Sequence, residues 1–89
     1  MMYVENTQKS RSKMVLNDKT KIMAYLNSVK IHAAAATLFY DNESERAVGG
    51  LLSYRDDAFA WTNETVYHFD KYNYPLPEAF IEHIRQKIT

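Results

Sequence analysis

The stretch "AFAWTNETVYHFDKYNY", residues 58–74, dominates the middle of the chain because it holds six of the twelve aromatic residues (1 Trp, 7 Tyr and 4 Phe). In "AFAWTN" the side chains of Phe59 and Trp61 are two positions apart and would share one face of a β-strand. In "TVYHFD", residues 65–70, alternating side chains predict another strand. Asn63-Glu64 lies between them, and Asn favours turns. The pattern predicts two strands joined by a turn.

The residues before this stretch predict a further hairpin. "DNESER", residues 41–46, has the composition of a turn or exposed loop. "AVGGLLSYR", residues 47–55, favours a strand, and Asp56-Asp57 forms a tight turn after it. Gly49-Gly50 within that strand predicts a β-bulge or a close approach of another backbone. No Lys-Ser/Thr pair follows these glycines, so a phosphate-binding loop is disfavoured.

The region N-terminal to the turn allows two interpretations. Asn17 or Asp18 can cap a helix, and helical spacing of the apolar residues favours a helix over residues 18–30. The favoured continuation is a strand at residues 35–41, because "ATLFYD" has the Thr and aromatic content of a strand. The alternative is a single helix over residues 18–40, which four consecutive alanines favour.

The C-terminal segment "YPLPEAFIEHIRQKIT" predicts a helix. Pro77 and Glu78 suit its first turn, and Arg85 and Lys87 suit its last turn. Its apolar stripe would pack on a sheet and consists of Phe80, Ile81, Ile84 and Ile88. The predicted fold class is therefore α+β: an N-terminal helix, a three- to four-stranded antiparallel meander, and a C-terminal helix packed on one sheet face.

Length and composition predict one folded domain. The chain has 89 residues, 46% of them hydrophobic, with only two Gly and two Pro. We assign residues 1–16 to a mobile basic N-terminal arm and residues 17–89 to a single α+β domain. The absence of cysteine excludes disulfides and thiolate chemistry. We find no signal-peptide pattern and no apolar run of the ~18–20 residues that span a membrane, so we expect a cytoplasmic protein.

The residues with catalytic or metal-binding potential do not form a recognisable motif. His68 and Asp70 have a spacing that could seat a metal on a strand, but a third ligand and a His-Glu-x-x-His pattern are missing. Ser53 lacks a surrounding Gly-x-Ser-x-Gly motif. We therefore predict no enzyme activity, no metal and no cofactor. A small hydrolase or metal-dependent enzyme is the least favoured alternative.

The charge distribution bears on nucleic-acid binding. Residues 1–32 carry six basic and two acidic side chains, whereas residues 33–70 carry two basic and seven acidic ones. A nucleic-acid-binding domain is the second alternative, using the aromatic sheet or a basic contact segment made of Lys9, Arg11 and Lys13. The acidic side chains threaded among the aromatics disfavour it.

The predicted element order also bears on nucleic-acid binding. Helix, three strands and helix resembles the double-stranded RNA-binding domain in topology. That family has a Lys-Lys-x-Ala-Lys cluster at the start of its second helix. Here the corresponding stretch is "PLPEAFIEH" with Glu78 and Glu82, so the resemblance does not extend to the RNA-contacting residues.

Protein binding fits the composition best, because Tyr and Trp combine a large apolar body with a hydrogen-bonding tip. The candidate partner-binding residues are Trp61, Tyr72, Tyr74, Asp56, Asp57 and Glu64. We hypothesise a small binding module whose partner is a protein of unknown identity, in the manner of an accessory or inhibitor protein of a phage or mobile element. Homodimerisation through an edge strand is a related expectation.

Overall fold

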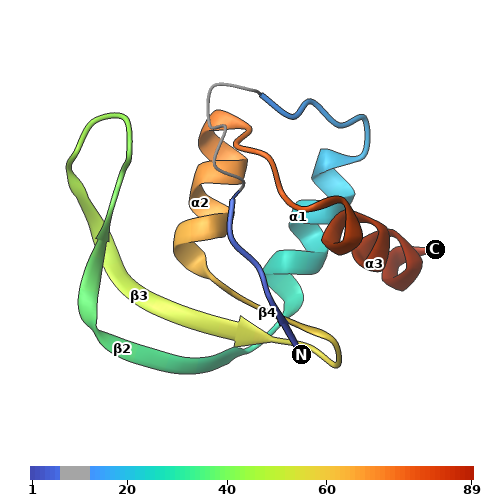
Figure 1. Ribbon diagram of the computed structural model, residues 1–89, viewed down its shortest axis with the longest axis horizontal. Coiled ribbons are helices and arrows are strands. Elements are labelled where there is room, and N and C mark those ends of the chain that lie inside the picture. Colours follow the sequence, from blue (N-terminus) through green and yellow to red (C-terminus); the bar gives the residue numbers. More distant parts are fainter. Residues whose placement is uncertain (7–12) are drawn as a thin grey trace.

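The computed structural model shows an α+β fold with three helices and a four-stranded mixed sheet (Figure 1). It describes residues 1–6 and 13–89. The elements are β1 (Met2–Tyr3), α1 (Lys19–Ser28), β2 (Ile31–Tyr40), β3 (Ala47–Arg55), β4 (Phe59–Thr62), α2 (Asn63–Tyr72) and α3 (Glu78–Ile88). The predicted α+β class is confirmed.

The sheet differs from the predicted all-antiparallel meander. Its strand order is β1-β4-β3-β2, and β1 pairs parallel to β4 through Met2 and Tyr3. Val4 then enters the core with 2% of its surface exposed. Met14 and Leu16 pack against the same core. These residues belong to the folded domain rather than to a solvated arm. Residues 7–12, with Lys9 and Arg11, lie outside the described part of the chain.

The predicted strand over residues 65–70 is wrong, because this segment belongs to helix α2. Thr65, His68 and Phe69 are buried at spacings of three and four, the period of one helix face. Glu64 lies in the first turn and Lys71 in the last, where each complements the helix dipole. The helix ends at Asn73, whose left-handed φ of 58° and backbone N–H to the Phe69 carbonyl form a C-terminal cap.

The ambiguity over residues 18–40 is resolved in favour of a helix followed by a strand. Helix α1 ends at Ser28, and Val29 is already extended, with φ −81° and ψ 134°. Strand β2 begins at Ile31 and pairs antiparallel with β3. Pairing with a neighbouring strand therefore overrides the helix propensity of Ala33–Ala36.

Strands β2 and β3 form a long curved hairpin, residues 31–55, which we call the hairpin. Figure 1 shows it curving away from the helices at its base and rising beside α2. Its pairing register shifts three times, and the largest change adds two residues to β2 between Ala34 and Leu38. Such bulges bend a ladder and increase its twist. The bulge predicted near Gly49-Gly50 is confirmed, since these residues pair with Phe39 and Leu38 next to the shifts.

Gly50 has no conformational or steric need to be glycine. Its φ is not positive, and a Cβ added there would meet no atom within 4 Å. We expect Gly50→Ala to raise the free energy of unfolding by roughly 0.5–1 kcal/mol, the amount by which Gly disfavours a strand interior. Urea denaturation followed by circular dichroism measures this change. A lowered stability would instead show that the bend at this position requires glycine.

The core lies between the sheet and helices α1 and α3. Phe59 and Trp61 of β4 each place their rings 5.1 Å from the ring of Phe80 in α3. Ile22 and Leu26 of α1 are buried in the same cluster. Phe80 of α3 therefore contacts β4 from within this shared core.

Candidate functional site

The turn of the hairpin is attached to helix α2 by a buried carboxylate. Asp41, the first residue after β2, is only 2% exposed. It accepts hydrogen bonds from the hydroxyl groups of Tyr67 at 2.5 Å and Tyr72 at 2.7 Å. The Lys71 ammonium lies 3.5 Å from the same carboxylate. We call this arrangement the Asp41 junction. It fixes the turn of the hairpin against one helix.

Asp41 also organises the turn itself. Its Oδ1 atom accepts the backbone N–H groups of Glu43 and Ser44 at 2.7 and 2.9 Å. Burial alone would raise the pKa of Asp41, but the hydrogen bonds from Tyr67, Tyr72 and the two backbone groups hold that pKa far below its usual range. The carboxylate therefore stays charged, and each of its hydrogen bonds is charge-assisted.

A buried histidine extends the junction. His68 is 3% exposed, and its Nδ1 atom lies 2.8 Å from the Glu64 carbonyl oxygen, which can only accept a hydrogen bond. Nδ1 therefore carries the hydrogen. Nε2 accepts the backbone N–H of Asn42 at 2.9 Å. Both nitrogens of a neutral imidazole are thus used to hold the turn. Asp70 is exposed and lies two positions further along the helix, so it does not share a face with His68.

Tyr72 and Tyr74 belong to the Asp41 junction. Tyr74 is 4% exposed, its hydroxyl donates to Glu43, and its ring stacks on His68 with a centroid distance of 5.2 Å. The Nζ atom of Lys13 lies 5.6 and 5.4 Å from the ring centroids of Tyr72 and Tyr74. Their place before a proline suggested loop residues available to a partner. The burial of Tyr74 and the hydrogen bond from Tyr72 to Asp41 show that both tyrosines make contacts within the chain.

Trp61 is likewise unavailable as a surface contact. Its side chain has no exposed surface, and it stacks on Tyr54 at 6.4 Å. Its Nε1 atom has no hydrogen-bond partner among the described residues. Glu64, in contrast, is exposed in the first turn of α2, as a contact residue must be. The sequence alone could not separate these cases, because strand alternation does not show which face is covered.

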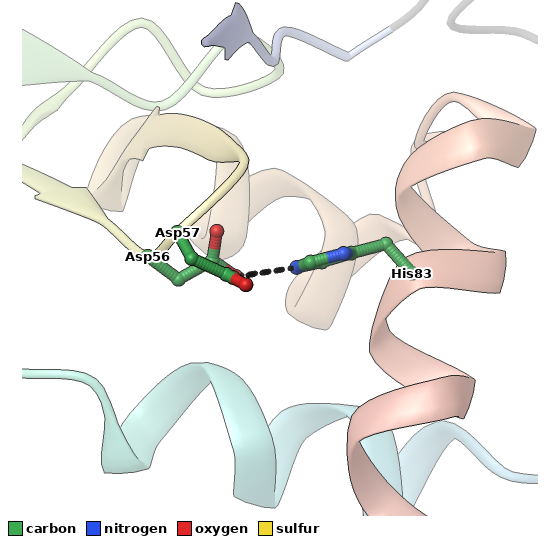
Figure 2. A group of neighbouring side chains, drawn as sticks. All are labelled: Asp56, Asp57 and His83. Atoms are coloured by element: carbon green, nitrogen blue, oxygen red, sulfur yellow. Dashed lines mark hydrogen bonds and ion pairs between the residues drawn. The ribbon is translucent and has the colours of Figure 1, made fainter.

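Asp56 and His83 form a second, partly buried polar cluster, seen in Figure 2 between the β3–β4 turn and helix α3. His83 donates from Nε2 to Oδ2 of Asp56 at 2.7 Å. The Tyr25 hydroxyl of α1 donates to the same oxygen at 2.6 Å, and Oδ1 accepts the N–H groups of Ala58 and Phe59. Both oxygens are occupied, and Asp56 joins three elements.

Asp57 completes the one group of His and acidic side chains, among residues 1–6 and 13–89, that lie close enough to hold a metal ion. Its Oδ1 atom lies 3.8 Å from Nε2 of His83, and its Oδ2 accepts from Lys87 at 3.0 Å. A metal would have to displace the Tyr25 and His83 hydrogen bonds to Asp56. The arrangement suits an ion-pair network that ties the β3–β4 turn to α3 better than it suits a metal centre.

The charged form of Asp56 and the neutral form of Tyr72 make the stability of the fold depend on pH. Burial would raise the pKa of Asp56, but hydrogen bonds from Tyr25, two backbone N–H groups and His83 lower it to about 2 from 3.8. The unfolded chain therefore takes up this proton first, and the contribution of Asp56 is lost as the pH falls from about 4 to about 2. The hydrogen bond to Asp41 raises the pKa of Tyr72 from 10.0 to about 12, so its contribution is lost as the pH rises over that interval.

We expect both effects in melting temperatures recorded against pH. Asp56→Asn should flatten the acid side, and Tyr72→Phe should flatten the alkaline side. An acid profile unchanged by Asp56→Asn would show that other carboxylates control it.

A cleft of about 710 Å³ opens between the hairpin and helices α1 and α2. Its lining mixes polar and apolar side chains, with Lys30 and Asp70 as the charged members. The apolar side chains are Met23, Leu26, Val29, Ile31, Phe39, Tyr54 and Val66. The volume of this cleft lies within the range of small-molecule binding sites.

The hairpin carries an apolar surface that the reasoning from sequence did not single out. Every residue of β2 except Phe39 is exposed. Four large apolar side chains of the hairpin are 40–58% exposed: Ile31, Leu38, Tyr40 and Val48. Neither β2 nor β3 up to Tyr54 contains Asp, Glu, Lys or Arg, although 25% of the chain is charged. That gap in the charge pattern was visible in the sequence and marks this surface.

Comparisons of the chain with protein family models, curated proteins and solved structures give no match. Among the described residues, no helix combines the length and apolar character needed to cross a membrane.

Proposed function

We propose that this protein is a non-catalytic module that binds another protein chain through its hairpin. One observation carries the proposal: a long two-stranded ribbon exposes Ile31, Leu38 and Tyr40 and has no charged side chain in β2. Exposed apolar patches mark interaction surfaces, and charged residues are depleted at the centres of interfaces. The uncharged hairpin has the composition expected of such a centre.

The Asp41 junction supports this role by holding the hairpin in one position. Its turn is bound to α2 through Asp41 and Asn42, and Phe39 packs edge-on against Tyr67 with a centroid distance of 5.7 Å. A surface that is ordered before binding loses less conformational entropy when a partner arrives. A ribbon without this attachment would lose more conformational entropy on association, which would weaken binding.

The polar clusters support binding rather than catalysis. The buried side chains of Asp41 and His68 and the partly buried side chain of Asp56 use their polar atoms in hydrogen bonds within the chain. A general base or nucleophile needs hydrogen-bond access to a substrate. The first turn of α2 carries the acidic Glu64 and no basic residue, which disfavours the phosphate contacts of the nucleic-acid alternative.

The test compares partner capture by two variants that add the same charge. Leu38→Lys introduces a cation at a 52% exposed position of the hairpin, and Val15→Lys does so at an 81% exposed position outside it. In nuclease-treated lysate, wild type and Val15→Lys should retain the same identified protein, whereas Leu38→Lys should lose it. Equal retention by both variants, or capture of nucleic acid alone, would overturn the proposal.

A further inference from the structure

We infer that His68 is a proton-sensitive attachment of the hairpin turn: uptake of one proton by its imidazole releases Asn42 and loosens the turn from helix α2. His68 is buried where α2 meets the turn, with 3% of its surface exposed. Histidine is the side chain whose charge ordinarily changes between pH 5 and 8. The switch acts within one chain, so it does not depend on which partner the hairpin binds.

The two hydrogen bonds of the His68 ring require its neutral form. Nδ1 donates to the Glu64 carbonyl oxygen at 2.8 Å, and Nε2 accepts the backbone N–H of Asn42 at 2.9 Å. An imidazolium carries a hydrogen on both nitrogens and accepts no hydrogen bond. A proton on Nε2 would therefore point at the N–H of Asn42, and the two donors would repel each other. Protonation of the ring and this contact with the turn exclude each other.

The acidic side chains beside the ring belong to the turn and already accept hydrogen bonds. Oδ1 of Asp41 accepts two backbone N–H groups of the turn, and its Oδ2 accepts two tyrosine hydroxyl groups. The carboxylate of Glu43 accepts the hydroxyl of Tyr74. A new N–H donor on Nε2 of His68 therefore gains an acceptor only when these contacts of the turn rearrange.

The other titratable groups around the ring come from α2 and from the segments that flank it. The rings of Tyr67, Tyr72 and Tyr74 have centroids 5.1, 6.2 and 5.2 Å from that of the imidazole. The ammonium of Lys71 lies over the first two of these tyrosines, and that of Lys13 lies over the last two. Tyrosine and lysine side chains ordinarily titrate near pH 10, and carboxylates near pH 4. The imidazole is therefore the group here that we expect to change charge between about pH 7.5 and 5.5.

The size of the effect follows from the coupling of proton uptake to release of the turn. The attached turn holds the neutral ring, whereas release exposes the ring to water, where imidazole takes up a proton near pH 6.5. The released form binds more protons, so lowering the pH favours it. The equilibrium constant for release should rise roughly tenfold between about pH 7.5 and 5.5. Asp41 stays charged in this range and keeps its hydrogen bonds, so the opening is local and the core stays folded.

Hydrogen exchange of the Asn42 amide, read by NMR and corrected for the intrinsic effect of pH on exchange, tests the switch. In the wild type its protection should fall roughly tenfold between about pH 7.5 and 5.5, whereas the amide of Ile84, a buried residue of α3, should keep its protection. His68→Gln should abolish the pH response, because the Gln Oε1 atom can accept from Asn42 and does not titrate. His32→Gln is the matched control: it makes the same change at an exposed histidine of β2 and should leave the response intact.

The imidazole spectrum of the wild type gives a second readout, which needs no variant to fold. Long-range ¹H–¹⁵N spectra should show His68 with its hydrogen on Nδ1 at about pH 7.5 and as the imidazolium at about pH 5.5. Constant protection of the Asn42 amide, a hydrogen on Nε2 at the higher pH, or a pH response that persists in His68→Gln would overturn the inference. An equal fall in protection at Ile84 would also overturn it, because the whole domain would then be opening. These measurements use the purified chain alone, so their outcome is separate from that of the capture test of the proposed function.

Discussion

Trp61→Ala should lower the free energy of unfolding by about 3–5 kcal/mol, the range for removing a buried large aromatic side chain. Trp61 has no exposed surface, and it contacts Tyr54 on one side and Phe80 on the other. Small domains have total stabilities near the lower end of about 5–15 kcal/mol. We therefore expect this one substitution to leave a large fraction of the protein unfolded at 25 °C.

Urea denaturation followed by far-ultraviolet circular dichroism measures the loss without relying on tryptophan fluorescence. Tyr40→Ala is the matched control, because Tyr40 is an aromatic residue that is 54% exposed. It should change stability by about 0.5 kcal/mol or less. Trp61→Phe should cost less than Trp61→Ala, since it keeps a ring and removes an indole N–H that has no hydrogen-bond partner in the described part of the chain. A small effect of Trp61→Ala would revive the interpretation of Trp61 as a binding residue.

The secondary structure was predictable from sequence where the apolar residues fitted only one period, either that of a helix or that of a strand. The stripe containing Phe80 and Ile84 admitted only a helix, and α3 follows it. In residues 65–70 the apolar residues fit the alternation of a strand, but Thr65, His68 and Phe69 also fit the period of a helix. The sequence of this segment was therefore compatible with either structure. The outcome depended on Phe69 reaching the core. Strand β1 has only two residues and is defined by its parallel partner β4, so it left no local pattern.

The Asp41 junction was not predictable for a related reason. Asp41 follows a strand and opens a turn, which a solvated aspartate also does. Its tyrosine partners lie 26 and 31 positions further along the chain, and they reach it only because residues 63–72 form a helix. An incorrect strand assignment there necessarily hid the junction. Tyr72 was predicted as a partner-binding residue; in the structure its hydroxyl donates to Asp41 at the hairpin turn.

Asp41→Ala should detach the hairpin turn while leaving the core folded. The substitution leaves the hydroxyl groups of Tyr67 and Tyr72 and the N–H of Ser44 without their acceptor. Loss of charge-assisted hydrogen bonds should speed hydrogen exchange of the turn amides by about ten- to a hundredfold. The amides to follow are those of position 41 and of Glu45. The first donates to the Arg46 carbonyl, and the second donates to the carbonyl of position 41. Amides of β4 and α3 should keep their protection, because their contacts lie in the separate core around Phe80.

Hydrogen exchange read by NMR separates this local opening from global unfolding. Asp70→Ala is the control, since it removes an exposed carboxylate from α2 without touching the junction. A uniform rise across β4 and α3 would mean that Asp41 stabilises the whole domain. No change at the turn would mean that Phe39 and His68 hold the hairpin without it. If the turn alone opens, the surface bearing Leu38 loses its fixed position, and binding through the hairpin should weaken even though none of its apolar side chains has changed.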